Sequence, residues 1–218
     1  MTAQPSGPAT AWRMSLPAGW VVWTPGAADL PALRANAATT KRAILPFSRG
    51  VAAVERQLAK ARGDVVQVGV RVPDPAAGLV TGSLFLTHLP RPVGKDGKPL
   101  TARQLLENRR AQRQARGRIY HHQELSLVTV PAGRAVLSNE LWRKSWGMRD
   151  VALLATEIFP RGTDSFFRLE LTSSYRELQP TLMAEISHMA HSFTVDRRGP
   201  DAGPDAGEEA DAEGDDGA

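Results

Sequence analysis

Hydrophobic and polar residues alternate along several stretches of this chain, which is the pattern of a half-buried β-strand. Every second residue at positions 66–72 is valine, and an apolar run at 80–89 follows a turn rich in proline and glycine. The same alternation at 12–16 is followed by a Pro-Ala-Gly turn and by the apolar segment 20–23. We predict that the strands at 66–72 and 80–89 pair with each other, and that 12–16 and 20–23 form a β-hairpin.

Two more hairpins are predicted in the second half of the chain. The apolar-rich segments 124–130 and 133–142 flank a short Pro-Ala turn. Segments 151–159 and 165–172 flank a turn that contains proline and glycine. Because proline and glycine interrupt strands and favour tight turns, each pair of segments is expected to run antiparallel.

Other regions carry apolar residues every three or four positions, which predicts amphipathic helices. Segment 28–45 is rich in Ala, Leu and Arg, and we expect its helix to be interrupted at Pro46. Ser48 is predicted to cap a second helix, which ends before Gly63. A last helix at 178–192 leads into a short strand at 193–195. The expected inner faces consist of Val51, Val54, Leu58 and Ala61 in the second helix and of Leu182, Met183, Ile186, Met189 and Ala190 in the last.

Antiparallel hairpins with helices before, between and after them predict an α+β fold, an antiparallel sheet of hairpins packed with helices. We expect one such domain at 12–196. Residues 1–11 and 197–218 contain too little apolar surface to offset the entropy of ordering the chain, so we predict a disordered N-terminus and a disordered acidic tail.

The order of these elements resembles the PsbP-like superfamily, which includes a photosystem subunit, the LpqN-type mycobacterial lipoproteins, the Ran-release factor family and the Eag-type secretion chaperones. The resemblance rests on the opening Leu-Pro-Ala-Gly-Trp at 16–20, on the helices and meander that follow, and on the helix-to-strand end at 189–195. It implies a sandwich that binds partners without catalysis. The chain lacks the lipidated cysteine of the lipoprotein branch.

The amino-acid composition excludes several kinds of functional site. The 218 residues include no cysteine, which excludes disulfides, thiolate catalysis and cysteine-held zinc or iron–sulfur centres. The longest apolar stretch, 151–155, is far shorter than the roughly 20 residues that cross a bilayer, and the first residues lack a secretory pattern, so a cytoplasmic location is expected. Only five of the 27 basic residues are lysine, and Ala, Gly and Pro are frequent, which suggests a GC-rich, actinobacterial genome.

The most distinctive segment, 95–118, carries eight basic residues and two acids. Thr101 and Gln104 fit a capping box, so a helix is predicted to begin there and to run toward residue 115. Its second half has few apolar residues and should project into solvent or lie loosely on the body. Three of its arginines fall within about 60° of arc on one helical face. The anion-binding residues predicted from this segment are Lys95, Lys98, Arg109, Arg110, Arg113 and Arg116.

Three interpretations of this basic segment stay open. It could be a solvated connector that only keeps the protein soluble. It could bind an acidic protein partner, since guanidinium groups suit carboxylates and phosphates. It could also bind nucleic acid through the helix at 101–118, in which case the affinity would fall steeply with salt.

The acidic tail raises a further possibility for the same segment. The net charge of +4 includes eight acids and no base at 201–218, so residues 1–200 carry 27 basic and 15 acidic residues, a net charge of +12. The flexible tail could fold back on the arginine face and screen it until a stronger anion competes. The acids of this segment are Asp201, Asp205, Glu208, Glu209, Asp211, Glu213, Asp215 and Asp216.

A second candidate surface joins two predicted strands. It consists of Trp142, Arg143, Lys144 and Trp146, where exposed aromatic and basic side chains could anchor a partner. The tryptophans at 12, 20 and 142 lie in strand patterns, which favours a place in the core for them, whereas Trp146 lies between the two strands.

No catalytic or metal-binding motif survives inspection. Glu185, His188 and His191 share the side of the last helix that we take as polar, but they spread over about 120° and suit a metal poorly. Nucleophile-elbow, phosphate-loop, dinucleotide and zinc-protease motifs are missing. We therefore predict a protein without catalytic activity, cofactor or metal, which acts as a protein-binding adaptor or chaperone-like module with a basic surface; the alternative is the nucleic-acid-associated protein above.

Overall fold

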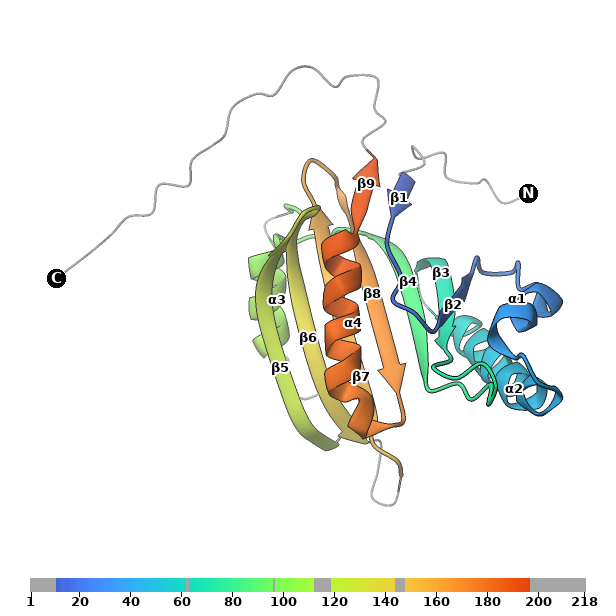
Figure 1. Ribbon diagram of the computed structural model, residues 1–218. Coiled ribbons are helices and arrows are strands. Elements are labelled where there is room, and N and C mark those ends of the chain that lie inside the picture. Colours follow the sequence, from blue (N-terminus) through green and yellow to red (C-terminus); the bar gives the residue numbers. More distant parts are fainter. Residues whose placement is uncertain (1–10, 62, 96, 112–118, 144–147, 197–218) are drawn as a thin grey trace.

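The structure is a computed structural model that describes residues 11–61, 63–95, 97–111, 119–143 and 148–196. Its centre is a seven-stranded sheet in the order β2-β3-β4-β8-β7-β6-β5, in which all neighbouring strands run antiparallel (Figure 1). In this order the strands are β2 (Trp20–Trp23), β3 (Asp64–Arg71), β4 (Gly82–Pro90), β8 (Ser165–Ser173), β7 (Val151–Pro160), β6 (Gly133–Arg143) and β5 (Ile119–Val130).

A separate two-stranded sheet joins the two ends of the described chain. It pairs β1 (Ala11–Arg13) with β9 (Thr194–Asp196) in antiparallel register, so that Ala11 lies opposite Asp196. Trp12 stacks on Phe193 with ring centroids 6.1 Å apart, which ties this small sheet to the main core. Residues 1–10 and 197–218, most of the predicted disordered ends, lie outside the described residues.

Helix α4 (Gln179–Ser192) crosses the first face of the sheet, over β7 and β8 (Figure 1). Its inner side chains Leu182, Ile186 and Met189 are fully buried against Leu84, Leu86, Phe167 and Leu169 of the strands. From Phe167 to Thr172 in β8, apolar residues alternate with polar ones, because successive strand residues point to opposite faces. The first face therefore holds the main core.

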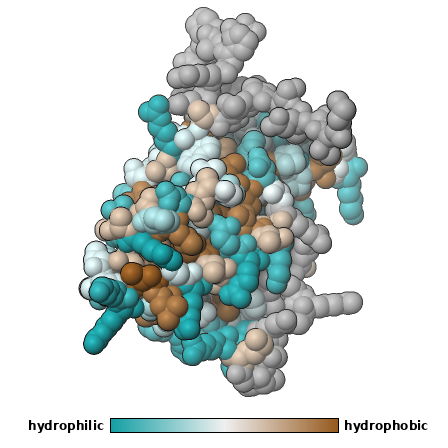
Figure 2. All heavy atoms as spheres, turned by 90° about the vertical axis from the view of Figure 1, so that its right-hand side faces the viewer, coloured by the Kyte–Doolittle hydropathy of each residue, from teal (hydrophilic) through white to brown (hydrophobic). Residues whose placement is uncertain are grey.

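The second face carries two groups of helices at its opposite ends. Helices α1 (Leu30–Ala37) and α2 (Lys41–Leu58) pack near β3, where Phe47, Val51 and Val54 contact Val68 and Val70. Helix α3 (Ala102–Ala111) packs against β5, β6 and β7. Figure 2 faces the side with α1 and α2 and shows hydrophobic patches separated by hydrophilic groups. The α+β class predicted from the sequence is confirmed.

The hairpin predicted at the start of the chain is wrong. Segments 12–16 and 20–23 do not form a hairpin, because β1 pairs with β9 and β2 pairs with β3. The tight Pro-Ala-Gly turn only redirects the chain between two sheets. Both partners are far away in sequence, so the local turn signal could not identify them.

The helix boundaries also differ from the prediction. The break falls at residues 38–40, and Pro46 lies inside α2, where its missing N–H removes one helical hydrogen bond. Thr40 caps α2 by accepting from the Ala43 amide, whereas the Ser48 hydroxyl donates to the Ile44 carbonyl within the helix. α2 ends at Leu58, before Ala61 and Gly63. Among the described helices, none is both long and apolar enough to span a bilayer.

The other strand pairings match the prediction. β3 pairs with β4, β5 with β6, and β7 with β8, each in antiparallel register. The predicted capping box of α3 is also present, since Thr101 and Gln104 each accept a hydrogen bond from the other's amide. Local turn and cap residues thus encode these elements.

Candidate functional site

The second face of the sheet is uncovered between α2 and α3, and polar side chains gather there. In β8 the apolar residues Phe167, Leu169 and Leu171 are buried on the first face, while Arg168, Glu170 and Thr172 point to the second. Because the strands are in register, these side chains lie in rows across neighbouring strands. Arg168 lies between Thr87 and Glu157, Glu170 between Phe85 and Ala155, and Thr172 between Ser83 and Leu153.

A groove of about 800 Å³ lies over these rows. Helix α2 and the residues after it form one wall with Gln57, Lys60 and Ala61, and the strands form the floor. The strand residues that line the groove are Phe85, Thr87, Leu89, Trp142, Val151, Leu153, Arg168, Glu170 and Thr172. The surface is thus largely apolar with a charged pair in its floor.

A second hollow of about 290 Å³ continues along α2. It shares Gln57, Val151 and Thr172 with the groove and reaches Gly50 and Tyr175. Small residues on this side of α2 keep the helix close to the 79–81 segment, since a Cβ on Gly50 would lie only 2.2 Å from Cγ2 of Val80. We refer to the two hollows together as the α2 groove.

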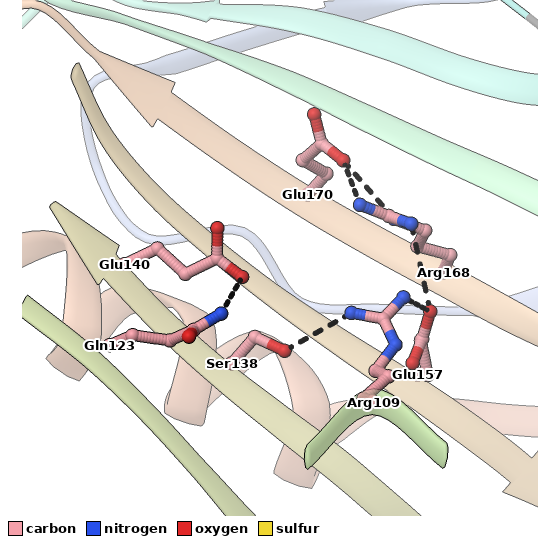
Figure 3. A network of polar contacts seen from close by, with 7 residues as sticks. All are labelled: Arg109, Gln123, Ser138, Glu140, Glu157, Arg168 and Glu170. Atoms are coloured by element: carbon pink, nitrogen blue, oxygen red, sulfur yellow. Dashed lines mark hydrogen bonds and ion pairs between the residues drawn. The ribbon is translucent and has the colours of Figure 1, made fainter. Parts of the chain in front are cut away.

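Four charged side chains from α3, β7 and β8 form a chain of ion pairs on the second face (Figure 3). Arg168 donates to Glu170 Oε2 at 2.7 Å, and its Nη1 lies 3.7 Å from Glu157 Oε1. Arg109 of α3 donates to the same Glu157 oxygen and, at 3.4 Å, to the Ser138 hydroxyl. This network connects α3 with the groove floor.

Glu157 is the most deeply buried member of the network, with 3% of its side chain exposed. Burial raises the pKa of its carboxyl group above the ordinary value, although Arg109 and Arg168 act in the opposite direction. Its Oε2 has no hydrogen-bond partner among the described residues. The loss of hydration therefore affects the pKa of Glu157 more than the two arginines do.

The groove floor offers groups for recognition. Arg168 and Glu170 are 31% and 26% exposed, so this ion pair borders solvent inside the groove. The guanidinium of Arg168 can donate hydrogen bonds to a ligand, and the carboxylate of Glu170 can accept them. A polypeptide backbone, which has both donors and acceptors, could bond to such a pair. The apolar groups of Phe85, Leu89 and Leu153 surround this pair. The arrangement suits binding of a ligand that is mostly apolar and has a few polar groups.

The structure places the predicted anion-binding residues at different locations. Lys95 and Lys98 are exposed in the loop between β4 and α3. Arg109 does not project into solvent, because it pairs with Glu157, and Arg110 donates to the Leu125 carbonyl at 3.3 Å. Arg113 and Arg116 lie outside the described residues, so the predicted arginine face cannot be assembled from the described residues alone.

The second predicted surface overlaps the groove at one residue. Trp142 lines the groove, and Arg143 donates to His121 at 2.9 Å and lies 3.7 Å from Asp150. Lys144 and Trp146 lie outside the described residues. Trp20 is buried as predicted, while Trp12 and Trp142 are partly exposed.

The sequence patterns did not single out Glu157, Arg168 and Glu170 as site residues. A signal was present, because each of these charged residues lies next to buried apolar residues within a strand. Glu185 was placed wrongly on the polar side of the last helix. Its carboxylate is buried and accepts from Trp20 Nε1 at 2.9 Å and from Arg71 Nε at 3.0 Å. Among the described residues, no group of three or more His, Cys, Asp or Glu side chains could hold a metal ion.

Together the strand order and helices define an α+β sandwich with one open sheet face. No protein-family model matches the sequence, and no curated protein matches it. Solved structures match the fold. Cyanobacterial PsbP (CyanoP) from Synechocystis sp. PCC 6803 is 13% identical with a TM-score of 0.42, and the match covers 90% of this chain and 98% of that chain.

Two further structures match this chain. LpqN, involved in cell envelope biogenesis of Mycobacterium tuberculosis, is 14% identical with a TM-score of 0.45, over 88% of this chain and 87% of that chain. PA94, a protein of unknown function and putative regulator from Pseudomonas aeruginosa, is 18% identical with a TM-score of 0.39. The match covers 60% of this chain and 83% of that chain. These likenesses stand as similarities to solved structures, and the PsbP-like resemblance stays a prediction.

Proposed function

We propose that this protein is a non-catalytic protein-binding module and that the α2 groove holds a segment of its partner. The observation that carries the proposal is the uncovered second face, where apolar side chains of three strands surround the partly exposed Arg168–Glu170 pair. Apolar walls supply affinity, and a fixed ion pair in the floor supplies orientation.

The predicted basic surface would add selectivity for an acidic partner. Lys60 lines the groove, and Lys95 and Lys98 are exposed in the loop before α3. Positive charge near a binding site raises the association rate of an acidic protein. The nucleic-acid alternative is weaker, because two arginines of α3 contact the sheet. Arg109 pairs with Glu157 of β7, and Arg110 donates to the Leu125 carbonyl of β5.

Site-specific photocrosslinking in the native host tests this proposal. A photoreactive residue replaces Lys60, which follows α2 and lines the groove, or Arg49, an exposed residue of α2 that does not line it. We expect one discrete crosslinked protein from position 60, resistant to nuclease and to a salt wash, and none from position 49.

Arg168→Gln in the chain with the crosslinker at position 60 should weaken that crosslink, because it removes the charged donor from the floor. Equal crosslinking from both positions, or no protein at position 60, would contradict the proposal. A nuclease-sensitive product at position 60 would favour the nucleic-acid alternative instead.

A further inference from the structure

A separate hollow of about 320 Å³ lies at one end of the sheet, beside the start of α3. It is bordered by the β5–β6 and β7–β8 turns and by the residue that follows β4. The lining residues are Arg91, Thr101, Ala102, Thr129, Gly133, Arg134, Phe159, Pro160, Arg161 and Gly162. We call this hollow the turn pocket; it shares no lining residue with the α2 groove.

The lining of the turn pocket contains three arginines and no acidic residue. Arg91, Arg134 and Arg161 form no ion pair with any carboxylate among the described residues. By contrast, Arg71, Arg109 and Arg168 are all paired with glutamates. Three neighbouring cations without a counter-charge repel one another, so this site favours an anion.

Arg91 is held in a fixed position in the turn pocket. Its Nη2 donates to the Pro160 carbonyl at 2.9 Å, and its guanidinium carbon lies 5.7 Å from the centre of the Phe159 ring. Its Nε is buried and has no acceptor among the described residues. The other two arginines are exposed, and among the described residues Arg134 donates one side-chain hydrogen bond, from Nη1 to the Thr129 hydroxyl at 3.2 Å. Several guanidinium N–H groups are therefore free to bind a ligand.

The loop between Arg91 and Thr101 adds to the positive charge. Both of these residues line the pocket, and the loop between them carries the exposed residues Lys95 and Lys98. A planar guanidinium binds two oxygens of phosphate in parallel, and several guanidiniums favour a dianion over a single carboxylate. We propose that the turn pocket binds a phosphate-type oxyanion.

The chain itself carries a competing source of oxyanions. Arg161 also lines a neighbouring hollow of about 180 Å³ with Thr194 and Val195, next to the end of the described chain. The eight acids at 201–216 follow in the sequence. Their carboxylates share the chemistry of a phosphate oxyanion, so the experiment includes a full-length variant in which these acids are replaced by the corresponding amides.

Titration of the protein with inorganic phosphate at constant ionic strength tests the pocket. The arginine Nε–H resonances are followed by NMR, and we expect a saturable shift of Arg91. Arg134→Gln with Arg161→Gln should raise the Kd for phosphate at least about tenfold, since each removes charged donors. Arg42→Gln with Arg49→Gln removes the same charge from exposed positions of α2 and should leave the Kd within about twofold.

Each outcome decides the proposal. Weaker binding in the pocket variant alone supports it. Phosphate binding that appears only when the tail acids are amides also supports the pocket and identifies the chain's own carboxylates as the competitor. Equal weakening in both arginine variants, or no saturable binding with or without the tail charges, overturns it.

Discussion

The carboxylate of Glu185 connects three parts of the fold through one side chain. It lies on α4 and accepts from Trp20 Nε1 of β2 at 2.9 Å. It also pairs with Arg71 of β3 at 2.9 Å, and both side chains of this ion pair are 11% exposed. A buried carboxylate needs such partners, because an unpaired charge in the core is costly. This contact holds α4 against the edge of the sheet.

Glu185→Ala should lower the free energy of unfolding by about 3–5 kcal/mol, measured by urea denaturation, because it leaves the Arg71 guanidinium without its counter-charge. Replacing both partners, Arg71→Met with Glu185→Leu, should cost less than Glu185→Ala alone. A double variant that is less stable than Glu185→Ala would show that the pair is not the source of the loss.

Glu157 has the opposite balance of forces, since burial dominates over its two arginine neighbours. Its folded pKa lies above the ordinary value of 4.5, so the folded protein retains this proton to a higher pH than the unfolded chain does. The contribution of Glu157 to stability is thus largest below the unfolded pKa and is lost as pH rises through the folded pKa.

Comparison with Glu157→Gln isolates this effect, because other titrating groups are common to both proteins. We expect the free energy of unfolding of the unmodified chain to fall relative to the variant as pH rises above about 4.5. Urea denaturation at pH 4 and pH 7 measures the difference. A difference that moves the other way would mean that the ion pairs with Arg109 and Arg168 outweigh burial.

Sequence patterns identify buried strand residues more readily than they identify buried charges. The segment 151–159 was correctly predicted as a strand, but nothing local showed that Glu157 would meet Arg109 from α3 and Arg168 from β8. Glu185 was misplaced for the same reason, since its partners lie 114 and 165 residues away. Pairing across elements decides the environment of a charged side chain.

Helix α2 approaches the 79–81 segment before β4 closely because Gly50 faces Val80. A glycine inside a helix ordinarily lowers stability, by roughly 0.5–1 kcal/mol relative to alanine. Here an added Cβ would lie 2.2 Å and 2.5 Å from two carbons of Val80. The contact therefore requires glycine at this position despite the cost to the helix.

Gly50→Ala should destabilise the protein by about 1–3 kcal/mol through overpacking, although alanine is the better helix former. Val80→Ala in the same chain should recover part of this loss, because it removes the two methyl carbons that lie 2.2 Å and 3.1 Å from the new Cβ and leaves the Cβ of residue 80 at 2.5 Å. Denaturation of both single variants and the double variant measures the coupling. Additive effects would exclude the clash as the cause.

At the scale of elements, local signals were sufficient where a turn or cap lies next to the residues it organises. The three hairpin pairings and the capping box of α3 follow from such signals. The predicted start of α2 was wrong, since Ser48 was expected as its cap and Thr40 caps it in the structure. Packing of Ala43 and Phe47 into the core fixes the longer helix.

In the whole molecule, the two faces of the seven-stranded sheet are covered by helices to different extents. α4 covers the first face, whereas α2 and α3 cover only the two ends of the second, and this difference creates the α2 groove. The α+β class followed from the order of strands and helices. The groove did not, because it depends on which helix covers which part of the sheet, and no local pattern encodes that.

The pairing of β1 with β9 also determines how the fold responds to tension. Ala11 and Asp196 lie opposite each other, and both strands lead away from this first pair toward the core. A force that pulls the ends of β1 and β9 apart at Ala11 and Asp196 acts on the paired residues one after another, so the backbone hydrogen bonds break in sequence rather than together. The small sheet would therefore peel apart under modest force, while the seven-stranded sheet behind it stays intact until Trp12 has left Phe193.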